Sequence, residues 1–79
     1  MSRKSILTLD VRQVPFWRRL TLILASLDGL AEGAALELIA DLDPQPLRQY
    51  LDATRPEVFD WCYLESGPEV WRISVARKA

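Results

Sequence analysis

The stretch AALELIADLDPQPL, residues 34–47, decides the fold because it passes from a strand pattern to the start of a helix. Apolar side chains recur at every second position from 34 to 40, which is typical of a strand. Asp43 can then cap a helix, and Pro44 suits its first position. We predict a strand over 34–40 and a helix over about 44–54. The expected buried side of this helix carries Leu47, Tyr50 and Leu51.

The segment before this stretch predicts a strand followed by a longer helix. Residues 6–10 are mostly apolar and read as the first strand, and Pro15 stands in the first helical turn, where proline is tolerated best. Gly29 ends the helix as a residue suited to left-handed geometry. Apolar residues at helical spacing predict one stripe facing the core, formed by Phe16, Leu20, Ile23, Leu24, Leu27 and Leu30.

The segment after it predicts a hairpin, with strands over 59–65 and 70–76 and a turn between them. If the turn has two or four loop residues, the apolar side pairs Leu64 with Trp71 and Cys62 with Ile73. The other side then carries Trp61, Tyr63, Arg72 and Ser74. The order β-α-β-α-β-β predicts a single domain over residues 1–79, an α/β two-layer sandwich whose two helices cover one face of a four-stranded mixed sheet.

Composition limits the classes of function. The 79 residues contain 10 Lys plus Arg and 11 Asp plus Glu, so neither nucleic acid nor an anionic membrane is an expected partner. The single cysteine cannot form an internal disulfide, and the start of the chain lacks the apolar run of a signal peptide, so we expect a cytoplasmic protein. The chain has no His and no recognisable catalytic or metal signature. We therefore expect neither enzymatic activity nor a cofactor.

Three motifs carry a resemblance to a known family. They are LDVR at 9–12, DLDPQPL at 41–47, and W-x-YLE-x-GPE-x-WR at 61–72. With the element order, they make the chain similar to the TusA/SirA-like sulfur-carrier fold, and more closely to a bacterial sister family of unknown function. The resemblance implies the same two-layer fold over nearly the whole chain.

The resemblance also shows where this chain departs from the carriers. Sulfur carriers have a Cys-Pro pair at the start of the first helix, where the helix dipole stabilises a thiolate. Here Phe16-Trp17 stands at that place, which excludes a persulfide relay by the carriers' mechanism. Members of the sister family tend to have His at the positions of Leu20 and Leu42.

The start of the first helix is a candidate anion site. Its open N–H groups belong to Phe16 and Trp17, and Arg12 lies close in the sequence. The alternative is that water and backbone satisfy these N–H groups. A second candidate is a partner-binding patch of Trp61, Tyr63 and Arg72 on the open sheet face, because Trp, Tyr and Arg dominate binding hot spots. The alternative is that these rings belong to the core.

Two further groups have a functional and a structural interpretation. Asp10, Asp41 and Asp43 could converge on a hard metal ion, or serve as caps and ion-pair partners, and we favour the second interpretation. Cys62 could be a relocated nucleophile or a buried, inert thiol, and again we favour the second. We thus expect a non-enzymatic domain that binds a protein partner or itself through the open sheet face. The alternative is a sulfur-relay or small-anion-binding protein that uses the start of the first helix.

Overall fold

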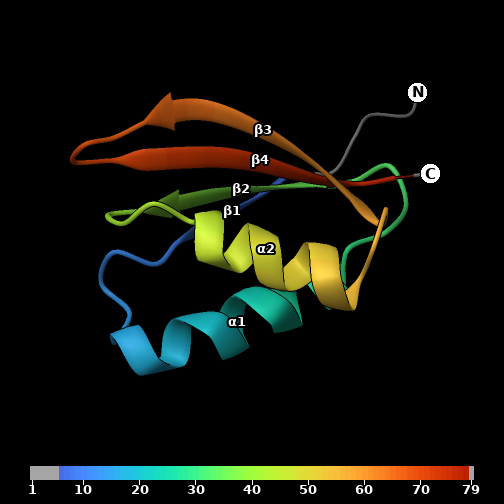
Figure 1. Ribbon diagram of the computed structural model, residues 1–79, viewed down its shortest axis with the longest axis horizontal. Helices are drawn as coiled ribbons and strands as arrows, with labels where there is room; N and C mark the ends of the chain where they lie inside the picture. Colours follow the sequence, from blue (N-terminus) through green and yellow to red (C-terminus); the bar gives the residue numbers. More distant parts are fainter. Residues whose placement is uncertain (1–5, 79) are drawn as a thin grey trace.

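The computed structural model describes residues 6–78 and has two layers, a four-stranded sheet and a pair of helices (Figure 1). The elements in chain order are β1 (Ile6–Asp10), α1 (Phe16–Asp28), β2 (Ala35–Ala40), α2 (Gln45–Thr54), β3 (Phe59–Ser66) and β4 (Trp71–Arg77). Both helices lie on the same face of the sheet, below it in Figure 1. The predicted β-α-β-α-β-β sandwich is confirmed.

The sheet has the order β1-β2-β4-β3. β1 and β2 are parallel, with Leu9 opposite Leu38, and β4 runs antiparallel to both of its neighbours. A parallel pair needs a crossover connection, and α1 provides it. The carboxyl ends of β1 and β2 therefore lie side by side, and the polar loops after Asp10 and Ala40 meet at the same edge of the sheet.

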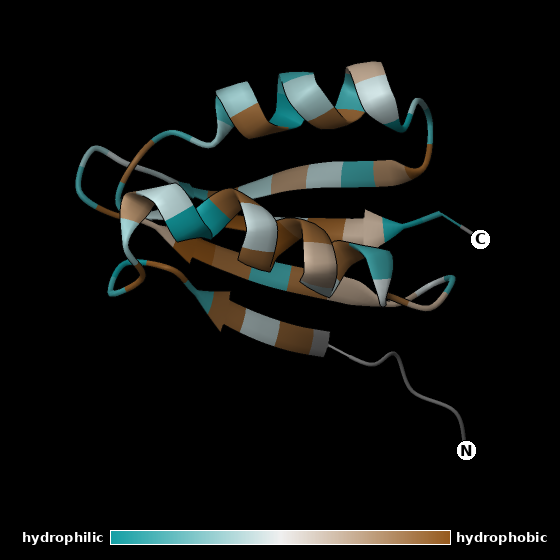
Figure 2. Ribbon diagram, turned by 90° about the horizontal axis from the view of Figure 1, so that it is seen from below, coloured by the Kyte–Doolittle hydropathy of each residue, from teal (hydrophilic) through white to brown (hydrophobic). Residues whose placement is uncertain are grey.

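The core lies between the sheet and the helices. β2 alternates strictly, with its buried residues at every second position, as its sequence pattern predicts. Figure 2 views the molecule from the helix side, and apolar segments are present in all four strands. The most deeply buried side chains are Val11, Leu27, Leu36, Leu38, Leu51, Ile73 and Val75.

The helix ends differ slightly from the expectation. α2 begins at Gln45 with Pro44 in the capping position, one residue later than predicted. Asp43 still satisfies the helix start, because its Oδ1 accepts a hydrogen bond of 3.0 Å from the Gln45 N–H. At the end of α1, Gly29 has φ of -86°, so the left-handed geometry expected there is wrong.

The expected facing of β3 is also wrong. A β-bulge between Tyr63 and Glu65 places Tyr63 opposite Ile73 and Cys62 opposite Ser74. The bulge adds one residue to β3, and a one-residue shift moves every earlier side chain of the strand to the other face. Trp61 and Tyr63 therefore pack against the core on the helix side. Cys62, expected to be buried, is exposed.

Candidate functional site

A cleft between α1 and α2, named here the apolar cleft, is the first candidate site. It has a volume of about 410 Å³, and Val11 and Leu38 from the core reach its lining. Four exposed apolar side chains complete it: Phe16 (68% exposed) and Leu20 (45%) from α1, Leu42 (53%) from the loop after β2, and Tyr50 (43%) from α2. Contiguous exposed apolar surface of this kind marks interaction sites.

The apolar cleft corrects the prediction that Phe16, Leu20 and Tyr50 face the core. The second half of the predicted stripe is confirmed, since Ile23 and Leu27 are buried. The first half of α1 and the facing side of α2 leave an open space between them instead of packing together. Helical periodicity shows which side chains share a stripe, but it does not show whether a neighbouring element covers the whole stripe.

A network around Arg19 holds the rim of the apolar cleft. The Arg19 guanidinium donates to the Asp41 carboxylate at 2.7 Å and to the Val14 carbonyl at 2.9 Å. The hydrogen bond from Arg19 lowers the pKa of Asp41 below its ordinary value. The guanidinium also lies 5.6 Å from the centre of the Phe16 ring. One mostly buried cation thus fixes the entry to α1 against the end of β2.

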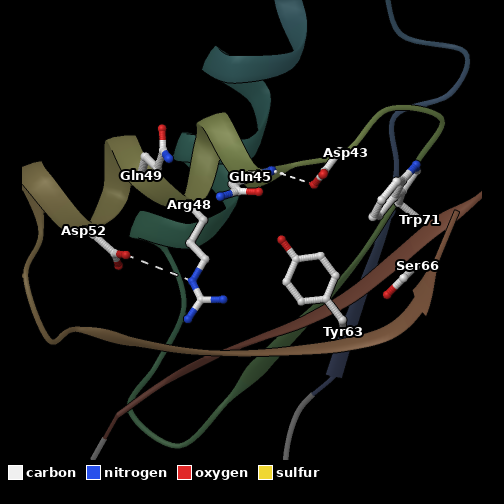
Figure 3. A pocket seen from close by; sticks show the side chains of 8 residues that line it. All are labelled: Asp43, Gln45, Arg48, Gln49, Asp52, Tyr63, Ser66 and Trp71. Carbon is white, nitrogen blue, oxygen red and sulfur yellow. Dashed lines mark hydrogen bonds and ion pairs between the residues drawn. The ribbon is translucent and has the colours of Figure 1, made fainter. Parts of the chain in front are cut away.

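A second cleft, named here the polar cleft, lies on the other side of α2, between this helix and the β3–β4 hairpin (Figure 3). Its volume is about 460 Å³. Tyr63 and Trp71 form an edge-to-face pair in its wall, with ring centres 6.4 Å apart and an angle of 76° between the rings. The helix side of the cleft carries Gln45, Arg48, Gln49 and Asp52, and Asp43 and Ser66 complete the lining.

The sequence analysis did not predict the polar cleft, although the sequence of α2 contains a pattern that indicates one of its walls. The four polar residues of α2 recur at positions 45, 48, 49 and 52, which is the spacing of one helix face. That face is distinct from the one buried through Leu51. The facing wall of the hairpin could not be assigned, because it depends on the bulge that turns Tyr63 toward α2.

At the candidate anion site, the side chain of Arg12 binds the Asp10 carboxylate. Its Nε and Nη2 donate to the Asp10 carboxylate at 2.9 and 2.6 Å, and its backbone N–H donates at 3.0 Å. These bonds lower the pKa of Asp10 to about 2 and raise that of Arg12. Phe16 and Trp17 are exposed, and Pro15 provides no side-chain cap. Anion binding there stays a prediction, with Arg12 already in an ion pair.

The predicted aromatic patch is not assembled on the open sheet face. Trp61 and Tyr63 lie on the helix side, whereas Arg72 alternates with the buried Ile73 and lies on the opposite face. There Arg72 forms an ion pair of 2.7 Å with Glu37 of β2. The expected patch geometry is therefore wrong, for the same reason as the facing of β3.

The three carboxylates considered for a metal each have their own partner. Asp10 pairs with Arg12, Asp41 pairs with Arg19, and Asp43 accepts the Gln45 N–H. Within residues 6–78, no group of three or more His, Cys, Asp or Glu side chains is arranged to hold a metal ion. Across the same residues, no helix has the length and apolar character needed to cross a membrane.

The fold and the clefts on the two sides of α2 define a small two-layer α/β domain with concave surfaces. Comparison with known families gives its membership. Residues 8–77 match the family of uncharacterized conserved proteins DUF2249, and the chain belongs to this family. No curated protein and no solved structure is similar enough to the chain to be matched.

Proposed function

We propose that this protein is a non-enzymatic binding module that self-associates through the apolar cleft. The observation that carries the proposal is the convergence of Phe16, Leu20, Leu42 and Tyr50, all exposed, on one cleft. Burial of such side chains against a partner is favourable by about 25 cal/mol per Å² of apolar surface. This surface replaces the open sheet face as the proposed contact.

Charge supports a second copy of the chain as the occupant. The net charge of -1 produces little repulsion between copies. The rim of the cleft carries both signs, through Arg19 and Asp43, so it can be complementary to itself across a two-fold axis.

The proposal includes a relationship to the sulfur-carrier fold, supported by the β-α-β-α-β-β order. It does not include their chemistry, because Phe16-Trp17 occupies the start of α1 where the carriers have their Cys-Pro pair. A cytoplasmic location belongs to the same proposal and is supported by the single unpaired cysteine.

Sedimentation equilibrium from micromolar to millimolar concentration tests self-association. We expect a dimer for the wild type and a shift toward monomer, by at least tenfold in the dissociation constant, for Phe16→Ser and Leu42→Ser. Leu64→Ser is the matched control, because Leu64 is 51% exposed but lies in β3 outside the cleft. A wild type that stays monomeric throughout, or variants in the cleft that dimerise as well as the control, would show the proposal to be wrong.

A further inference from the structure

The polar cleft is a second concave surface, and Asp43 is the one lining residue in the described part of the chain that it shares with the apolar cleft of the proposed self-association. Its aromatic corner, formed by Tyr63 and Trp71, presents ring surface to the space below α2. In Figure 3 the Tyr63 hydroxyl points toward α2, and the Asp43 carboxylate lies between Gln45 and Trp71. Aromatic rings with a nearby carboxylate attract cations, because the faces of the rings carry negative charge.

The charges that line the polar cleft leave one carboxylate in excess. Arg48 and Asp52 form an exposed ion pair of 4.0 Å on α2. The Arg48 guanidinium also lies 5.9 Å from the centre of the Trp61 ring, so its charge already has two partners. Asp43 accepts a hydrogen bond from the Gln45 N–H, and among residues 6–78 it has no ion-pair partner. The open end of the cleft is therefore anionic.

From this arrangement we infer that the polar cleft binds an organic ammonium group, such as that of a free alkylamine or a lysine side chain. The ammonium lies near Asp43 and donates N–H groups to this carboxylate. The alkyl chain lies along the rings of Tyr63 and Trp71. The volume of about 460 Å³ is within the ordinary range of small-molecule clefts.

The first test titrates the protein with n-butylammonium at constant ionic strength. Binding is followed in NMR spectra through the backbone amide signals and the indole N–H signals. We expect saturable shifts at the Trp71 indole and the Gln45 amide, and none at the Trp17 indole, which lies outside this cleft. Butyrate and butanol are the matched anionic and neutral probes. If either shifts the Trp71 indole as much as butylammonium does, the inference is overturned.

Substitutions that change one charge distinguish binding in the polar cleft from nonspecific attraction of the cation to the protein surface. Asp43→Asn keeps an oxygen that can accept the Gln45 N–H but removes the charge, and it should weaken butylammonium binding about fivefold, the scale of one exposed charge pair. Arg48→Gln removes the only cation that lines the cleft among residues 6–78, and it should strengthen binding. Asp60→Asn, an exposed carboxylate paired with Lys78 outside the cleft, is the control and should leave binding unchanged. Equal binding by Asp43→Asn and the wild type would refute the inference.

A capped pentapeptide with one central lysine distinguishes the two sources of the ammonium group. Binding at least tenfold tighter than that of butylammonium assigns the site to a protein lysine, and equal binding assigns it to small amines. Both results support ammonium recognition, whereas absence of binding by both probes rejects it. Repeating the titration with Phe16→Ser separates this site from self-association, because Phe16 lines only the apolar cleft of the two.

Discussion

Arg19 and Asp41 are 22 positions apart in the sequence, and their side chains form an ion pair of 2.7 Å between α1 and the loop after β2. The same guanidinium donates to the Val14 carbonyl, so it also holds the segment that leads into α1. The side chain of Arg19 is only 15% exposed. A partly buried cation with several partners is worth more than an ordinary surface ion pair.

Replacement of Arg19 by alanine should therefore lower the free energy of unfolding by about 1–2 kcal/mol, because hydrogen bonds of charged groups are lost. Asp41→Asn should have a smaller effect, since the bond from Arg19 to Val14 remains. Urea denaturation of both variants checks the order. An Arg19→Ala protein as stable as the wild type would contradict the role of this network.

Protonation of Asp10 should destabilise the fold in acid. Hydrogen bonds from the Arg12 side chain and backbone lower the pKa of Asp10 from 3.8 to about 2. A carboxyl whose pKa is lower in the folded state stabilises the protein above the unfolded pKa, and this contribution is lost as pH falls through the folded pKa. The loss should therefore occur between about pH 4 and pH 2.

Asp10→Asn is the control for this pH dependence. The difference in unfolding free energy between wild type and variant should be present at pH 6 and shrink toward pH 2. Denaturant titrations at several pH values measure it, and the Asp10 carboxyl carbon signal in NMR gives the pKa directly. A constant difference across this range would contradict the prediction.

Trp61 should behave as a core residue whose buried, unpaired indole N–H lowers the stability of the fold. Its ring packs against the core, but its indole Nε1 is buried without a hydrogen-bond partner. We expect Trp61→Ala to cost about 2–4 kcal/mol of unfolding free energy. Trp61→Phe should cost clearly less, because it keeps most of the ring and removes the unpaired donor. Thermal and urea unfolding distinguish these outcomes, and equal losses in the two variants would be inconsistent with this assignment.

Cys62 should react readily with a thiol reagent in the folded protein, since it is exposed on the open face opposite Ser74. Its rate should approach that of a cysteine in a short peptide. Cys62→Ser should change the free energy of unfolding by no more than about 0.5 kcal/mol, as for most surface substitutions. Protection of the thiol until the protein unfolds would place Cys62 back in the core.

Gly67 should be the least replaceable of the described glycines. Its φ is 60°, and an added Cβ would lie 2.6 Å from the Trp71 ring. Gly67→Ala should therefore cost at least about 1–2 kcal/mol. Gly29→Ala is the matched control, because the nearest atom to its added Cβ is 3.6 Å away and its φ is negative. A differential scanning measurement in which both variants melt together would contradict the expectation.

Most of the fold could be predicted because its local patterns agree with its long-range packing. The alternation in residues 34–40 and the stripe through Ile23 and Leu27 each mark a buried face, and the structure buries both. The facing of Trp61 could not be predicted, because it depends on where the extra residue in β3 is accommodated. No local pattern distinguishes a bulge at Leu64 from a longer turn.

The candidate sites were less predictable than the fold, for a related reason. A cleft is the space that packing leaves between elements, and Phe16 has the same helical spacing whether or not α2 covers it. Ion pairs between residues close in the sequence, such as Asp10 and Arg12, could be predicted from the sequence. The pairing of Arg19 with Asp41 required the three-dimensional arrangement of α1 and β2.

The bulge at Leu64 also affects how the sheet can grow. β3 is an outermost strand, and its unpaired side offers backbone groups to which a strand of another molecule could add. An extra residue in that strand kinks it and breaks the regular spacing of these groups. Such interruptions are a common natural defence against edge-to-edge aggregation. Deletion of Leu64 should restore regular spacing along this edge strand, and we expect the resulting protein to form fibrils while its core stays intact.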